Sequence, residues 1–501
     1  MANALKKLAG ETAIYGLSTI LARIINFAFV PIYTRVLMPG QYGVVTELSA
    51  YIAMLQVLLV MGLESGCFRF ASEEGADTNK VFTGALASVF TVNSAFLALV
   101  LVFLGPITSA LGYAGYEKCI FYMAGTLFLD NVTAILFAKL RHEHKALRFA
   151  VIKTVKILTE TAVNLFLFLS PWKPEWVSLF VSGQPDFDYV IFAIFVSSVV
   201  CALMMLPTLL RLRFRFDRAL LKRMLLYSLP LMIAALPGIV NDFLDRILFR
   251  FFDNGSEAWR ASLGLFQASV KLAVIMNLFI QMFRFAAEPF FFQRAKQKNS
   301  PLLYAKVMNW FTAFCGLVFL GVILYLDIIG LIIGQNFRSA LGVVPIMLLA
   351  YMILGMNFNV SMWYKLSDHT RMAFWITLAG LVVTTVINVV FMPLYSYYAA
   401  AWGHLLSYLV MFVISALLGA KYYPIPYDWK RLGAIVAVML GVYALSLPAG
   451  HFLGVEGTGA EMLKEGRFWL KMLVNTALVG AYALTAFKLL GGRKGLQAFQ
   501  E

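Results

Sequence analysis

The chain has 501 residues, of which 61% are hydrophobic and 13% are charged, and its formal net charge is +15. Soluble domains carry roughly 25% charged residues, so this composition excludes a soluble globular protein. Apolar runs of about 20 residues recur from end to end, and each can cross about 30 Å of hydrocarbon. The positive charge is therefore interpreted as membrane topology rather than as a sign of nucleic-acid binding.

The sequence predicts an all-α integral membrane protein with about 14 transmembrane helices. The expected spans are 11–37, 43–68, 81–105, 118–138, 149–170, 189–210, 224–251, 263–292, 306–326, 341–363, 372–392, 397–418, 432–448 and 468–490. The four cysteines lie in or beside these apolar runs without a metal-binding spacing, so they are expected to be small core residues.

The connections between spans alternate in charge. Most lysine and arginine outside the spans falls in one set of connections, which includes 139–148, 211–223 and 293–301, and at the two ends of the chain. The other set, which includes 38–42, 171–188 and 454–466, is poor in them. The positive-inside rule then predicts that the first set and both termini are cytoplasmic.

The first span carries a polar stripe on one helix face, and Arg23 lies on that stripe near the middle of the bilayer. An arginine at that depth is costly, so a water-filled cavity is favoured there over a buried ion pair. Arg35 lies at the outer end of the same span. It is either a snorkelling interface anchor or part of an outer gate with Glu47 of the next span.

The fifth span places Lys153, Lys156, Glu160 and Asn164 on one stripe that descends from the cytoplasmic end. Lys156 and Glu160 are four residues apart and can pair with each other, which leaves Lys153 near the cytoplasmic mouth. Asp130, midway along the fourth span, is a second candidate partner for one of these cations.

The seventh and eighth spans hold the other intramembrane charges. Pro230 and Pro237 predict a kinked or broken seventh span, which continues with the charged residues Asp242, Asp245, Arg246 and Arg250. In the eighth span, Arg284 and Glu288 are expected to form an i, i+4 pair. Lys271 has no carboxylate three or four residues away in the sequence, so it is the better ligand candidate.

The chain contains an internal repeat. Residues 6–37 resemble 222–252, residues 42–71 resemble 263–292, and Phe-Arg-Phe-Ala recurs at 68–71 and 283–286. The repeat predicts two six-span lobes around a central cleft, arranged as parallel repeats. The expected divisions are an N-terminal lobe at 1–210, a basic cytoplasmic linker at 211–223, a C-terminal lobe at 224–418, and two further spans with a tail at 419–501.

Four stretches, "PIYTRVLMPGQYG" (31–43), "YSLPLMIAALPGIVNDFLDRILF" (227–249), "LGLFQASVKLA" (263–273) and "EPFFFQRAK" (288–296), carry a resemblance to a known family. In this order they resemble the polysaccharide transporter branch of the multidrug/oligosaccharidyl-lipid/polysaccharide (MOP) exporter superfamily, and O-antigen-type (Wzx-like) flippases in particular. The resemblance implies a non-enzymatic flippase of the bacterial inner membrane. It would carry a polyprenyl-pyrophosphate-linked oligosaccharide to the outer leaflet by alternating access.

The resemblance also implies a cationic central cavity, in which Arg23 and Lys271 would bind the phosphates, with Lys153 and Arg246 as further candidates. The potential ion-coupling or gate residues are Arg35, Glu47, Asp130, Asp242 and Asp245. We expect no metal and no cofactor beyond Na⁺ or H⁺ as a coupling ion. The expected partners are the lipid-linked substrate, membrane lipid and glycan-assembly proteins such as a polymerase, for a chain that acts as a monomer.

Three alternatives remain open at this point. The resemblance extends to lipid II-type flippases of peptidoglycan synthesis and to drug or cation antiporters of the same superfamily. The alternative of another class is a membrane glycan polymerase or acyltransferase. The short outer connections disfavour such an enzyme, and only one of five histidines, His404, falls within a span.

Overall fold

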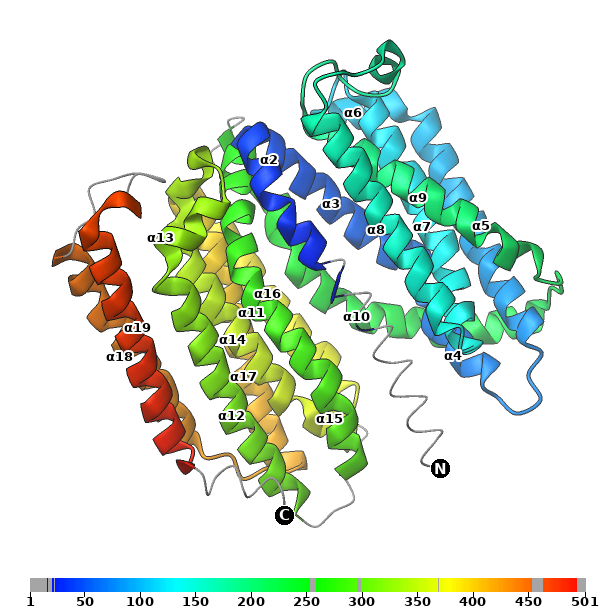
Figure 1. Cartoon of the computed structure of the whole chain (residues 1–501). Coiled ribbons are helices and arrows are strands. Elements are labelled where there is room, and N and C mark those ends of the chain that lie inside the picture. The colour runs from blue at the N-terminus through cyan, green and yellow to red at the C-terminus, as the bar shows by residue number, and fades with distance from the viewer. Residues whose placement is uncertain are drawn as a thin grey trace. The chain divides into compact units, whose positions relative to one another are not determined.

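The computed structural model describes residues 16, 20, 21, 23–252, 258–294, 299–367, 369–452 and 463–492, and these contain helices but no strand. The chain divides into two compact units, Met1–Ile247 and Leu248–Glu501. Figure 1 shows the helices of each unit running largely alongside one another. The all-α class predicted from the sequence is confirmed.

The first unit includes a short helical stretch at residues 23–28. Its elements are α2 (Val30–Val36), α3 (Pro39–Val60), α4 (Leu63–Ala71), α5 (Thr78–Val102), α6 (Leu104–Ala110), α7 (Glu117–His142), α8 (Ala146–Leu169), η1 (Glu175–Leu179), α9 (Phe187–Leu210) and most of α10 (Arg218–Phe252). Its core joins α4, α5, α7, α9 and α10 through buried residues such as Leu63, Phe82, Leu136, Met205 and Met224.

The second unit contains α11 (Ala258–Arg294), α12 (Ser300–Ile323), α13 (Leu326–Ile329), η2 (Gly330–Ile332), η3 (Gln335–Val343), α14 (Val344–Val360), α15 (Met362–Leu366), α16 (Met372–Tyr395), α17 (Tyr397–Tyr422), α18 (Trp429–Phe452) and α19 (Gly466–Leu489). The helices α18 and α19 pack on α12, where the Tyr482 hydroxyl donates to the Ala313 carbonyl at 3.1 Å. Lys471 of α19 also pairs with Asp327 at 2.5 Å. These two helices are therefore part of the second unit.

Twelve stretches of the described chain are long and apolar enough to cross a membrane. The sequence predicted two more. One is α8, which has 24 residues but carries four charged groups. The other is the first span, 11–37, part of which lies outside the described residues. A multi-pass membrane protein is confirmed, and the difference in number arises at these two segments.

The connection predicted at 38–42 is shorter than expected. The helix α3 already begins at Pro39, directly after Leu37 caps α2. Proline suits the first helical position because its missing N–H would have no helical partner there. The Gln41 side chain accepts a hydrogen bond from the Met38 backbone N–H at 2.8 Å, which closes the first turn. The Pro-Gly-Gln-Tyr-Gly sequence is thus a helix start and not a loop.

The second predicted span is interrupted. Met61 and Gly62 have φ angles of 56° and 66°, and this left-handed pair separates α3 from α4. A Cβ atom at position 62 would lie 2.7 Å from the Ser228 carbonyl oxygen of α10. Glycine is needed there both for the backbone angle and for the close approach of α10.

The seventh predicted span is not broken. The helix α10 runs without interruption from Arg218 to Phe252 through Pro230 and Pro237. Its N-terminal part packs on α4, where the Arg69 guanidinium lies 4.2 Å from the centroid of the Tyr227 ring. These contacts explain why the first compact unit extends into α10, beyond the linker expected at 211–223.

Candidate functional site

The first unit contains a polar cavity of about 260 Å³ among its helices. Residues of α3, α4, α7 and α8 line it: Gln56, Glu64, Asp130, Thr133, Ala134, Phe137, Arg141, Phe149, Lys153 and Lys156. On α7 the lining positions 130, 133, 134, 137 and 141 recur at helical spacing, as do 149, 153 and 156 on α8. Each helix therefore presents one polar stripe to the cavity.

The deep end of the cavity is closed by an ion pair. The Lys156 ammonium of α8 contacts both carboxylate oxygens of Asp130 on α7, at 2.6 and 2.7 Å. Both side chains are only 18% exposed, so water screens the pair weakly. Of the two partners that the sequence offered to Lys156, the structure selects Asp130 and not Glu160. A lysine four residues before a glutamate is the weaker helical order, and Asp130 approaches from the neighbouring helix.

The other end of the cavity holds a second pair, which the sequence did not predict. The Arg141 guanidinium donates to Glu64 of α4 at 2.8 Å. Arg141 was assigned to the connection 139–148, but α7 continues to His142 and carries it along the same face as Asp130. The spacing of eleven residues between Asp130 and Arg141, which is close to three helical turns, could have placed both on one face of the helix. At 1.5 Å per residue, it places the Cα atoms of the two residues roughly 16 Å apart along the axis of α7.

Lys153 lies between the two pairs on α8. Its ammonium nitrogen is 4.4 Å from the centroid of the Phe137 ring, and it forms no ion pair with another described residue. The cavity lining therefore has three cationic side chains, Arg141, Lys153 and Lys156, against the carboxylates Glu64 and Asp130. A cation in excess, in a site that water screens weakly, favours an anionic group.

The other candidate residues lie outside this cavity. Glu47 is buried on α3, where its carboxylate accepts hydrogen bonds from Tyr51, at 3.0 Å, and from Tyr113. Arg35 is exposed at the end of α2 and donates to the Pro31 carbonyl at 3.2 Å. The Tyr113 contact of Glu47 was not visible in the sequence, because Tyr113 lies in a distant connection, whereas Tyr51 follows Glu47 at helical spacing.

Arg23 belongs to the first unit and Lys271, on α11, to the second. Their predicted meeting in a central cleft stays a prediction. Asp242, Asp245 and Arg246 follow one another along the C-terminal part of α10, and the Arg246 guanidinium lies 4.7 Å from the centroid of the Phe243 ring.

The predicted pair of Arg284 and Glu288 is wrong. Glu288 instead accepts a hydrogen bond from Lys365 of α15 at 2.5 Å. The Arg284 guanidinium lies 4.6 Å from the centroid of the Phe358 ring. A partner from another helix replaces the one on the same helix, as it does for Lys156.

A family profile described as "Polysaccharide biosynthesis protein" matches residues 8–295. No sequence among curated proteins matches the chain. Among solved structures, the fold resembles the lipid II flippase MurJ in an inward closed conformation, with a TM-score of 0.69 and 13% identity over 95% of this chain and 98% of that one.

Two further solved structures share the fold. One is an inward-facing multidrug resistance MATE family transporter of the MOP superfamily, with a TM-score of 0.62 and 14% identity over 82% of this chain and 95% of that one. The other is a Vibrio cholerae MATE transporter, with a TM-score of 0.55 and 11% identity over 84% and 96% of the two chains. At these identities the likeness establishes the fold alone.

Proposed function

Because the chain belongs to the polysaccharide biosynthesis protein family, we propose that it is a flippase for a polyprenyl-pyrophosphate-linked oligosaccharide. It would carry this lipid from the cytoplasmic to the outer leaflet of the bacterial inner membrane by alternating access. The observation that carries the proposal is the polar cavity of the first unit, in which the lining cations outnumber the carboxylates. A pyrophosphate cannot cross hydrocarbon unaided and needs a polar, cationic path.

In this proposal, Arg23, Lys153, Arg246 and Lys271 supply positive charge along the path of the phosphates. The lipid tail stays in the bilayer while the headgroup crosses. An anion that moves outward gains about 2.3 kcal/mol per charge for each 100 mV of negative-inside potential. The membrane potential can therefore drive transport directly, without ATP.

Ion coupling is the alternative source of energy. Na⁺ or H⁺ would then act at Glu47, Asp130, Asp242 or Asp245. Asp130 neutralises Lys156, so protonation of Asp130 would leave the Lys156 ammonium without its counter-charge, as a second cation beside Lys153. The two mechanisms differ in their response to voltage at fixed ion gradients.

The second candidate substrate is a lipid II-type peptidoglycan precursor. The likeness of the fold to MurJ, which extends over nearly the whole of both chains, supports this candidate. It shares the polyprenyl pyrophosphate with the first candidate, so the cavity does not separate the two. A drug or cation antiporter would accept cationic substrates, which an excess of cavity cations disfavours.

The test uses the full chain in liposomes that hold one fluorescent lipid, either a lipid-linked oligosaccharide or lipid II. A potassium–valinomycin potential of either sign is imposed at fixed pH and sodium. We expect the final leaflet distribution to follow the sign of the potential for one of the lipids, and Lys153→Gln to slow its transfer at least tenfold. The proposal would be overturned if neither lipid were transferred while the same liposomes took up a drug cation. A distribution that tracks only a sodium or proton gradient would replace the voltage mechanism with ion coupling.

A further inference from the structure

The connection between α9 and α10 alternates arginine with apolar residues. Its sequence, from 211 to 216, is Arg-Leu-Arg-Phe-Arg-Phe, and residues 212–217 form neither helix nor turn. The large apolar side chains in and beside it are exposed: 80% for Leu210, 73% for Phe214 and 52% for Phe216. Apolar groups of this size in water are unfavourable unless another apolar phase covers them.

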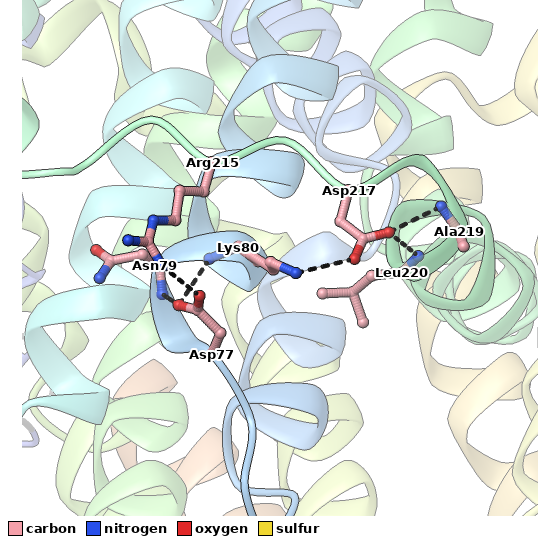
Figure 2. A network of polar contacts seen from close by, with 7 residues as sticks. All are labelled: Asp77, Asn79, Lys80, Arg215, Asp217, Ala219 and Leu220. Carbon is pink, nitrogen blue, oxygen red and sulfur yellow. Dashed lines mark hydrogen bonds and ion pairs between the residues drawn. The ribbon is translucent and has the colours of Figure 1, made fainter.

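The connection is nevertheless held in a fixed place. Figure 2 shows Asp77 and Asp217, which cap the N-termini of α5 and α10, with the Lys80 side chain extending from α5 toward Asp217. Each cap also contacts a cation from the other segment: Arg215 with Asp77 at 3.5 Å, and Lys80 with Asp217 at 3.4 Å. We call this arrangement the cap clasp. It fixes the end of the connection against α5, so the exposure of the two phenylalanines is not the result of a free loop.

The clasp uses only part of the positive charge. Arg215 and Arg223 pair with Asp77 and Glu73. Arg211, Arg213 and Arg218 are exposed and form no ion pair with other described residues. Three cations therefore remain available beside two exposed aromatic rings.

The position of the connection along the chain indicates which apolar phase covers its phenylalanine rings. The helices α9 and α10 are both candidate membrane spans, and the connection joins their adjacent ends. We therefore expect it to lie at the boundary between hydrocarbon and headgroups, on the face that the positive-inside rule assigns to the cytoplasm. At that depth phenylalanine rings can enter the acyl region while arginines meet phosphates.

We propose that Arg211, Arg213, Arg218, Phe214 and Phe216 form a binding surface for anionic phospholipid. The phosphodiester would contact the arginines and the acyl chains would cover the rings. This surface is separate from the polar cavity and does not depend on which lipid is transported. An acidic soluble protein is the other partner that the arginines would fit, but it would leave the phenylalanines in water.

The experiment measures lipid contact in the full chain. Because all four native cysteines are buried, Ala219→Cys provides an accessible site for a bimane fluorophore at the start of α10. The protein is placed in bilayers with brominated phosphatidylglycerol or brominated phosphatidylcholine, and quenching gives the relative association of the two lipids. We expect a clear preference for phosphatidylglycerol that weakens with added salt.

Three variants decide the outcome. Arg211→Gln/Arg213→Gln/Arg218→Gln should lower the preference on the order of fivefold for each arginine removed. Phe214→Ser/Phe216→Ser should reduce quenching by both lipids without changing its salt dependence. The matched control, Arg371→Gln/Lys421→Gln/Lys430→Gln, removes three exposed cations of the second unit and should leave the preference unchanged.

Three results would overturn the proposal. The first is equal quenching by both lipids in the parent protein, and the second is an unchanged preference in the triple arginine variant. The third is an absence of quenching by either lipid, which would place the connection in water and favour a soluble acidic partner. Elution of each variant as a single species on size exclusion shows that the chain has folded.

Discussion

At the scale of single residues, two lysines that line the cavity have different interaction partners. Lys156 neutralises a carboxylate that is mostly buried, whereas Lys153 contacts only an aromatic ring among the described residues. The two lysines lie one helical turn apart on α8, so their local environments in the bilayer are similar. Substitution of each should therefore reveal the difference in partner.

We predict that Lys156→Gln lowers the free energy of unfolding by on the order of 3 kcal/mol, because it leaves Asp130 without its cation. Lys153→Gln should cost less, about 1–2 kcal/mol, which is the value of one cation–π contact in a partly buried site. Thermal unfolding of the purified protein measures both. The double variant Asp130→Asn/Lys156→Gln should recover part of the loss. Equal destabilisation by the two single variants would contradict this division of roles.

At the scale of elements, the break between α3 and α4 depends on one glycine. Gly62 combines a left-handed backbone with a close approach to the Ser228 carbonyl. Gly75 provides a matched control, because its φ is +76° but nothing lies within 4 Å of its added Cβ. The two positions separate backbone strain from steric contact.

We predict that Gly75→Ala costs roughly 1–2 kcal/mol of unfolding free energy, which is the backbone term alone. Gly62→Ala should cost clearly more, since α10 must also move away. Thermal unfolding of the two variants side by side checks the difference. If both cost the same, the packing of α4 on α10 would not require the glycine.

The cap clasp should depend on pH. The pKa of the Asp217 carboxyl lies below its usual value, chiefly because the carboxylate accepts a hydrogen bond from the Leu220 N–H. Lys80 lowers this pKa further, and desolvation opposes part of the shift. A depressed pKa means that the stabilisation is complete above the unfolded-state value of about 4 and is lost as the pH falls through the folded-state value. We predict faster hydrogen exchange in the first turn of α10 at acid pH, and in Asp217→Asn at neutral pH. Exchange that is insensitive to both changes would show that the cap does not hold this turn.

At the scale of the whole molecule, the distribution of charge predicts the topology. We expect Arg213→Cys, in the basic connection, to react only with reagents that cross the membrane. Gln184→Cys, in the connection between α8 and α9, should react with an impermeant maleimide from outside. The four native cysteines are buried and provide a low background. External labelling at position 213 would reverse the orientation.

The sequence by itself determined the membrane class and nearly all of the spans. It also pointed to Lys153, Lys156 and Asp130, whose roles in transport stay predictions. Hydrophobic length and helical periodicity are local properties, so they can be read directly from the chain. The family match at residues 8–295 agrees with the resemblance found in the four motifs.

Only the tertiary structure decided which charges pair. Helical spacing predicted that Lys156 pairs with Glu160 and Glu288 with Arg284. In the structure Lys156 pairs with Asp130, and Glu288 pairs with Lys365, each on another helix. The same holds for Glu64 with Arg141, and for the crossed contacts of the cap clasp. In each case a charge pairs with the partner that helix packing brings within hydrogen-bond distance. Spacing along one helix does not contain that information.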